Sequence, residues 1–379
     1  MFIRISRPTK EKCKVCGKEA ITISRTLKVC SNCIRDKPDQ ASPLIEAAHR
    51  RTREAYGLPT QPPSSTSGVI CKICANECQM THGERSYCGL RWEEKGHLKS
   101  YISSRMALVH TYYDPLPTNC CAAWFCPGSK AHGSVNYAVF FYGCGFNCLF
   151  CQNESHKKVE DAPSMTLERF VEKALNPRVS CICYFGGDIS PQLPFALKAS
   201  KYILEQCASN RIMRICWETN GIGNPKLMRE AAELSLRSNG NVKFDLKALN
   251  PTLARALSGV SNQRAYENFA MITNEFYEQR PKNPVLTAVT LLTPGYTDEK
   301  EVERIAQFIA ELNSEIPYSL LIFHPAHYMT DLPITPPDQV ERCYQVARKY
   351  LKYVNIGNKH FLPTRLRNID KSSLWHVRN

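Results

Sequence analysis

The sequence predicts an α/β protein, a partial (β/α) barrel with small cysteine-rich metal-binding modules in front of it. The first observation is that, from residue 137 onward, apolar runs of strand length alternate with helix-like segments. Continuous apolar strands that alternate with helices are typical of a parallel sheet covered by helices. The second is that cysteines occur in closely spaced pairs before Gly89, which indicates small modules held together by metal.

Each barrel element follows from its own segment. The expected strands are residues 137–142, 181–185, 212–217, 242–246, 285–292 and 319–323. The expected helices are residues 167–175, 193–207, 225–236, 264–278, 299–312 and 337–350. Six such units joined by right-handed crossovers build a full or partial barrel, in which catalytic residues gather where the strands end.

Composition divides the chain into regions. We expect a four-cysteine metal-binding knuckle over 1–40, a helix and linker over 41–68, a second cysteine-rich segment over 69–133, the barrel over 134–360 and a C-terminal extension over 361–379. Within the second region, 44–56 has a ragged apolar helical face and 57–68 is rich in Gly, Pro and Ser, as linkers are. The stretch after Cys88 is expected to be irregular as far as Gly133.

Composition also excludes some classes of protein. The chain has 379 residues, of which 43% are apolar, and no run approaches the roughly 18 consecutive apolar residues of a membrane helix. Residues 1–7 lack the apolar region of a signal peptide, so we expect a cytoplasmic protein with no membrane partner. In a reducing cytosol, clusters among the 19 cysteines bind metals rather than form disulfides. A net charge of +14 fits an acidic partner, a nucleic acid or a basic proteome, and does not choose among them.

The most informative motif follows the first barrel strand directly. Cys144, Cys148 and Cys151 have the spacing CxxxCxxC, which lets three thiolates wrap one face of a cubane iron–sulfur cluster and leaves one iron free of cysteine. Such an open iron is what a chelating ligand requires. The alternative is a zinc loop whose fourth cysteine lies elsewhere in the chain. The position of the loop at a strand end favours the cluster.

This loop, with Phe150 just before its last cysteine, resembles the cluster motif of the radical S-adenosylmethionine (SAM) superfamily. The resemblance implies a [4Fe–4S] cluster on the three cysteines, SAM as its ligand and an electron donor as a partner. It also implies the chemistry. The reduced cluster splits SAM to give a 5′-deoxyadenosyl radical that abstracts hydrogen from a strong C–H bond, while the protein orients both and excludes water.

Later segments resemble, in the same order, motifs of the activase-like members of that superfamily. They are GGD at 186–188 where the family has GGE, TNG at 219–221, DLK at 245–247, TPGYTD at 293–298 and HPAHYM at 324–329. Taken singly, each is also an ordinary turn, capping loop or strand end, and the shared order argues against coincidence. The alignment of the last segment could slip by three residues, to His324. The resemblance implies that SAM is contacted by Gly186, Gly187, Asp188, Asn220, Asp245, Lys247 and His327.

The cysteine-rich front end of the chain indicates which branch of the superfamily the chain resembles. Residues 71–78, 86–91 and 96–98, with 114–117 and 357–358, resemble the AmmeMemoRadiSam-type branch, and the cluster motif, the late-barrel segment and this front end together cover roughly 70–360. The nearest group that we can name is the cobalamin-dependent glutamine C-methyltransferases of methyl-coenzyme M reductase. That resemblance implies C-methylation of an unactivated sp3 carbon in a protein or peptide substrate, the alpha subunit of methyl-coenzyme M reductase. The sequence has no DxHxxG segment, so cobalamin would have to lie against the barrel mouth.

Two other enzyme functions remain open. One is a glycyl-radical-enzyme activase, in which the radical simply removes a glycine hydrogen. The other is an RNA-modifying radical SAM enzyme that binds through the four-cysteine knuckle and the basic surface. A metal-binding scaffold without catalysis is a third alternative. We expect a protein substrate rather than a nucleic acid.

The remaining cysteines fall into groups. Two CxxC pairs with the spacing of a tetrahedral zinc or single-iron site are formed by Cys13, Cys16, Cys30 and Cys33. A second four-thiolate set, for one metal ion or an auxiliary cluster, is formed by Cys71, Cys74, Cys78 and Cys88. No role is assigned to Cys120, Cys121 and Cys126. We expect small apolar packing roles for Cys181, Cys183, Cys207, Cys216 and Cys343.

Overall fold

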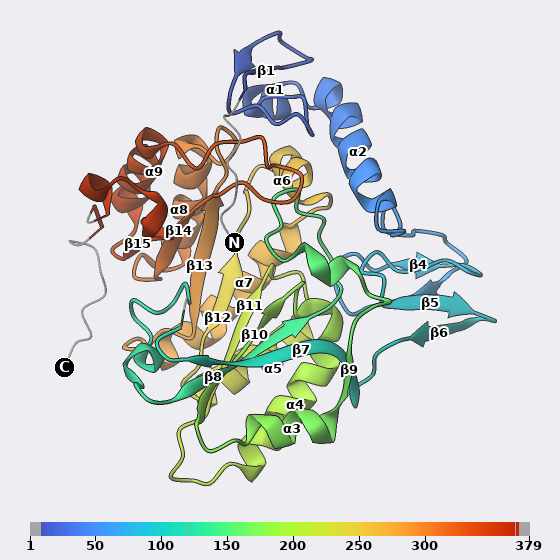
Figure 1. Ribbon diagram of the computed structural model, residues 1–379, viewed down its shortest axis with the longest axis vertical. Coiled ribbons are helices and arrows are strands. Elements are labelled where there is room, and N and C mark those ends of the chain that lie inside the picture. Colours follow the sequence, from blue (N-terminus) through green and yellow to red (C-terminus); the bar gives the residue numbers. More distant parts are fainter. Residues whose placement is uncertain (1–8, 119, 368, 371–379) are drawn as a thin grey trace.

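A single nine-stranded sheet forms the body of the protein in a computed structural model that describes residues 9–118, 120–367 and 369–370 (Figure 1). The strands lie in the order β15-β14-β13-β12-β11-β10-β8-β7-β9. Seven neighbouring strands are parallel: β8 (Val135–Phe141), β10 (Val179–Gly186), β11 (Arg214–Thr219), β12 (Val242–Asp245), β13 (Leu286–Leu292), β14 (Tyr318–Ile322) and β15 (Val354–Gly357). The predicted α/β class is confirmed, and the sheet is open, because β15 and β9 are its two edges among the described residues.

Helices cover the outer face of the parallel strands (Figure 1). They are α3 (Leu167–Ala174), α4 (Leu193–Gln206), α5 (Pro225–Arg237), α7 (Gln263–Phe276), α8 (Glu299–Asn313) and α9 (Pro337–Tyr350). The main apolar core lies between these helices and the sheet, with Tyr184 stacked on Trp217 at 4.5 Å. Short 3-10 helices span Pro127–Lys130, Glu154–Lys157, Ser190–Gln192, Tyr277–Gln279, Lys359–Phe361 and Thr364–Leu366. No helix within the described ranges is both long and apolar enough to cross a membrane.

The prediction that the chain is irregular between Cys88 and Gly133 is wrong in part. This stretch contains β5 (Arg91–Glu94), β6 (His97–Ser100) and the ten-residue β7 (Met106–Pro115). β7 pairs antiparallel with β8 and with the short β9 (Ser164–Thr166). Most side chains of its second half are exposed, so backbone pairing forms this strand without the apolar run that would reveal it.

The front of the chain lies beyond the carboxyl ends of the parallel strands (Figure 1). It contains β1 (Glu11–Lys12), β2 (Glu19–Ala20), α1 (Ser31–Asp36), α2 (Pro38–Glu54), β3 (Val69–Ile70) and β4 (Gln79–Met80). α2 begins six residues before the predicted start at 44, because Pro38 stands in its first turn and that turn is polar. Both α1 and α2 contact α6 (Pro251–Ser258), a short helix after β12 that the sequence did not reveal.

Candidate active site

A chamber of about 410 Å³ opens at the carboxyl ends of the parallel strands. Its wall includes Cys144, Cys148 and Cys151, from the loop that follows β8. Two N–H groups donate to the Cys144 sulfur, the backbone of Phe146 at 3.3 Å and the side chain of Asn220 at 3.7 Å. The chain therefore presents three sulfurs to one space and supports one of them with hydrogen bonds.

The arrangement of these sulfurs fits a multi-iron cluster rather than a zinc ion. Among the described residues, only one group of three or more candidate ligand atoms lies within 4.8 Å of one another, and it is the N-terminal group of four cysteines. Zinc bound by four thiolates at 2.3 Å requires such close sulfurs. Burial raises the pKa of the Cys144 thiol well above its usual value, and the Asp188 carboxylate raises it further. Iron would hold that sulfur as a thiolate.

Six of the seven residues that we predicted to contact SAM line the same chamber. They are Gly186, Gly187, Asp188, Asn220, Asp245 and Lys247. His327 is not part of this wall. It lies beside Tyr328 and Tyr56, with 6.0 Å between the His327 and Tyr56 ring centroids, and its buried Nε2 has no protein partner. His324 packs on Phe361 instead, at 5.2 Å between ring centroids.

Asp188, which stands where the family has Glu, is buried and joins two chamber loops. Its Oδ1 accepts hydrogen bonds from the Asn220 backbone at 2.8 Å and the Thr219 hydroxyl at 3.0 Å, and its Oδ2 accepts one from the Ser190 backbone at 2.8 Å. Burial raises its pKa, and these hydrogen bonds oppose the rise. The carboxylate therefore positions the GGD and TNG loops against each other. Its contact with SAM stays a prediction.

Several polar groups of the chamber fit a polar ligand. Lys247 and Asp245 form an ion pair, and the second oxygen of Asp245, Oδ1, is buried without a protein partner. Burial lowers the pKa of Lys247, but Asp245 and Cys148 more than reverse the effect, so its pKa is raised and the ammonium stays charged. His156 also lines the chamber, and its buried Nδ1 has no partner. The sequence did not single out His156, whose only signal is its place in the segment after Cys151.

Close approach between backbones shapes the same wall. A Cβ atom at Gly187 would lie 2.4 Å from the carbonyl oxygen of Gly143, which precedes the first cysteine of the cluster loop. No other residue type fits there without moving the backbone. The GGD loop and the cluster loop are therefore in direct contact, and this contact fixes one side of the chamber.

Residues 138–309 match the family model of the radical SAM superfamily. This segment therefore resembles a radical SAM domain, a class that implies a [4Fe–4S] cluster and SAM. The chain is 26% identical over 299 residues to the uncharacterised protein MJ0808 of Methanocaldococcus jannaschii, a match that covers 76% of this chain and 81% of that protein.

Activating enzymes are also among its relatives. The chain is 22% identical over 193 residues to pyruvate formate-lyase 1-activating enzyme of Escherichia coli, covering 50% of this chain and 74% of that protein. It is 35% identical over 141 residues to isethionate sulfite-lyase activating enzyme of Desulfovibrio desulfuricans, covering 37% of this chain and 40% of that protein. Among solved structures, Streptococcus suis SuiB bound to SAM superposes with a TM-score of 0.41 at 15% identity, covering 57% of this chain and 48% of SuiB.

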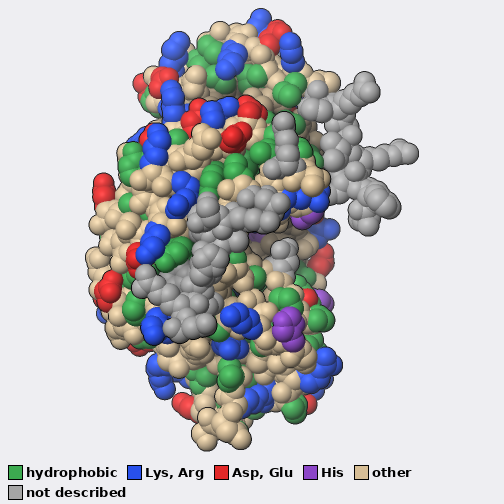
Figure 2. Space-filling view, turned by 90° about the vertical axis from the view of Figure 1, so that its left-hand side faces the viewer, with side chains coloured by type: hydrophobic (Ala, Val, Ile, Leu, Met, Phe, Trp, Pro, Cys, Tyr) green, Lys and Arg blue, Asp and Glu red, His purple; other side chains and the backbone are tan. Residues whose placement is uncertain are grey.

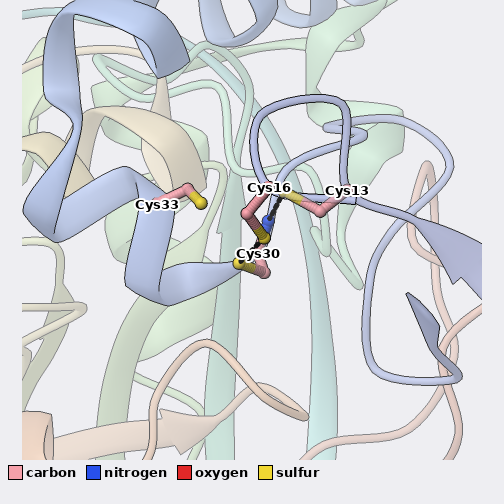
Figure 3. A group of neighbouring side chains, drawn as sticks. All are labelled: Cys13, Cys16, Cys30 and Cys33. Atoms are coloured by element: carbon pink, nitrogen blue, oxygen red, sulfur yellow. Dashed lines mark hydrogen bonds between the residues drawn. The ribbon is translucent and has the colours of Figure 1, made fainter. Parts of the chain in front are cut away.

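In front of the radical SAM domain, the four N-terminal cysteines come together as predicted (Figure 3). Cys13 and Cys16 lie on a turn, and Cys30 and Cys33 lie at the start of α1 and within it. The sulfurs of Cys16 and Cys30 are 3.8 Å apart. Two sulfurs bound to one tetrahedral metal ion, each at about 2.3 Å, have this same separation. This set fits one tetrahedral metal ion, zinc or iron.

The four-cysteine module is fixed to the radical SAM domain through the TPGYTD turn. Arg35 of α1 donates to both carboxylate oxygens of Asp298 at 2.8 Å and to the Tyr296 carbonyl at 2.9 Å. The Tyr296 hydroxyl donates to the carbonyl of Val29 at 3.0 Å. The sequence predicted this turn as a part of the barrel. The structure shows that the turn also binds the four-cysteine module through hydrogen bonds.

The cluster loop itself is tied to α2. The side-chain Nδ2 of Asn147 donates to His49 Nδ1 and to the Thr52 hydroxyl, both at 2.9 Å, and its Oδ1 accepts from the Lys157 ammonium. The other ring nitrogen of His49 donates to the Ala256 carbonyl at 3.0 Å. All of the polar atoms of the Asn147 side chain thus have buried partners.

The second cysteine set lies against the cluster loop. Cys71, Cys78 and Cys144 belong to one buried cluster of side chains. The Asn76 side chain donates to the Gly145 carbonyl at 2.8 Å, so the segment touches the loop directly. The sulfurs of Cys71, Cys74, Cys78 and Cys88 do not reach the mutual 4.8 Å separation of the N-terminal set.

The expected packing roles of the other cysteines agree with the structure. Cys343 is buried in the main core and Cys207 packs against it. The three strand cysteines pack with Leu116 in a small buried cluster separate from the main core, and they also line a cavity: Cys181, Cys183 and Cys216.

Proposed function

We propose that this chain is a radical SAM enzyme and that it modifies a side chain of a protein or peptide substrate. The observation that carries the proposal is the chamber at the strand ends, where Cys144, Cys148 and Cys151 lie with six of the predicted SAM-contact residues. When bound there, the [4Fe–4S] cluster and SAM supply a 5′-deoxyadenosyl radical. The protein would hold the cluster through the three thiolates and orient SAM through the GGD, TNG and DLK segments.

Two observations support a protein substrate. The relatives named as activating enzymes act on enzymes, pyruvate formate-lyase and isethionate sulfite-lyase. The sheet is also open between β15 and β9 in the described part of the chain, which gives a polypeptide segment a side from which to approach. Lys and Arg side chains are interspersed with Asp and Glu on the face in Figure 2, and this does not favour a nucleic-acid groove.

For the second cysteine set, the proposal is an iron–sulfur cluster rather than a single ion. Its four sulfurs are not as close together as the N-terminal four, and an iron–sulfur cluster spaces its thiolates more widely than one ion does. Its contact with the cluster loop, through Asn76 and Gly145, favours a role beside the radical SAM cluster.

For the reaction, the proposal remains cobalamin-dependent C-methylation of a glutamine in the alpha subunit of methyl-coenzyme M reductase. It rests on the sequence resemblance over roughly 70–360 and on no residue of the chamber. The second candidate is activation of a glycyl radical enzyme, which the two named activating enzymes favour.

One experiment separates these candidates. The anaerobically purified full chain is incubated with SAM, reductant, a cobalamin and either a glutamine-containing peptide of methyl-coenzyme M reductase or a glycine-loop peptide of pyruvate formate-lyase. Methylation predicts a mass gain of one methylene, with both 5′-deoxyadenosine and S-adenosylhomocysteine formed. Activation predicts 5′-deoxyadenosine alone and a glycyl radical in the electron paramagnetic resonance spectrum. Formation of 5′-deoxyadenosine with neither peptide changed would reject both substrates.

A further inference from the structure

A second cavity, of about 240 Å³, lies beside the chamber that Cys144, Cys148 and Cys151 line. Five cysteines line it: Cys120, Cys126, Cys181, Cys183 and Cys216. Three come from β10 and β11, and two from the segment that joins β7 to β8. Cys181 and Cys183 share a face because strand side chains alternate, and Cys183 is paired in register with Cys216. Two sequence-distant parts of the chain thus bring thiols to one space.

Charged groups lie beside two of these thiols. The ammonium of Lys243, 2% exposed, lies 3.1 Å from the Cys183 sulfur, 3.3 Å from the Cys120 sulfur and 2.7 Å from a carboxylate oxygen of Glu218. The ammonium donates hydrogen bonds to two of these sulfurs, as N–H groups do to the sulfurs of iron–sulfur clusters. Cys181 and Cys216 are also neighbours, with 3.8 Å between their sulfurs.

We propose that this cavity holds an additional iron–sulfur cluster. The ligands would be drawn from Cys181, Cys183 and Cys216 of the strands and from Cys120 and Cys126 of the connecting segment. A single tetrahedral ion does not suit the arrangement, because no three of these sulfurs lie within 4.8 Å of one another. A cluster spaces its thiolates more widely and accepts N–H donors such as Lys243 at its sulfurs.

The cavity adjoins the site of radical chemistry. Its wall shares Cys120, Phe185, Glu218 and Lys243 with the wall of the SAM chamber. The proposal does not depend on which reaction the enzyme performs.

Iron analysis of the full chain tests the proposal. The triple variant Cys181→Ser, Cys183→Ser, Cys216→Ser is reconstituted anaerobically beside the wild type and beside Cys207→Ser, a control whose cysteine lies outside the cavity. We expect the triple variant to lose about two or about four iron atoms and as many sulfides per chain, the content of one cluster. The electron paramagnetic resonance signal of the radical SAM cluster should remain and still respond to SAM. A folded triple variant with unchanged iron and sulfide would overturn the proposal.

A direct measurement covers the case in which the triple variant does not fold. Crystals of the reconstituted wild type are measured at the iron absorption edge. The proposal requires an iron peak enclosed by the five cysteines. An absent peak, or a peak that appears only at the zinc edge, would overturn it.

Discussion

Asn147 is the most informative residue to change, because its side chain forms buried hydrogen bonds between the cluster loop and α2. It is 1% exposed and has hydrogen-bonded partners in His49, Thr52 and Lys157. Asn147→Ala leaves these three buried groups short of one bond each. An unsatisfied buried polar group costs about 1–3 kcal/mol. His49 and Thr52 each keep one other bond, so we expect a total loss of about 3–5 kcal/mol in the free energy of unfolding.

The assay is anaerobic urea denaturation of the reconstituted chain, followed by circular dichroism. The matched control is Asn210→Ala, an exposed asparagine in the turn after α4, for which a change within about 0.5 kcal/mol is expected. The rate of reductive SAM cleavage should fall as well, because the loop that carries the cluster loses its anchor. A loss below about 1 kcal/mol for Asn147→Ala would refute the argument that this side chain holds the loop.

Two further predictions concern the N-terminal part. Burial, with the nearby Lys157 and Arg53 charges, lowers the pKa of His49 to about 4, against about 6.5 in an unfolded chain. The unfolded chain binds the extra proton between these values, so stability should fall by roughly 3 kcal/mol as pH drops from about 6.5 to about 4. Urea titrations of the wild type and His49→Gln should show a shallower loss in the variant, and equal slopes would contradict this. Separately, Cys33→Ala should lose about one metal ion per chain and melt earlier, while Cys207→Ala should do neither; retained metal in Cys33→Ala would remove Cys33 from the site.

Much of the barrel could be predicted because buried parallel strands are continuous apolar runs. β10 and β13 show this pattern, and both were expected within three residues of their observed ends. β7 was missed because its outer face is exposed, and β15 because four residues are too few for a pattern. Pairing between backbones, which the sequence does not display, creates both strands.

The chamber could be predicted because motifs at successive strand ends must meet in a barrel. The side-chain links that hold it could not. In the sequence, Asn147 cannot be told from any other loop asparagine, because its partners on α2 are far away along the chain. His156 belongs to no motif. The cavity beside the strand cysteines could not be predicted either. Cys counts as a small apolar residue in a run such as 179–185, and only the folded structure shows that one face of this run also borders a cavity.

The central claim is that Cys144, Cys148 and Cys151 hold the cluster that cleaves SAM. The most direct measurement is 5′-deoxyadenosine formed from SAM and reductant under anaerobic conditions by the wild type and by Cys144→Ala, Cys148→Ala, Cys151→Ala. We expect the wild type to form it and the triple variant to form none, while the metal on the N-terminal four cysteines stays bound. Continued formation of 5′-deoxyadenosine by a folded triple variant would contradict the claim.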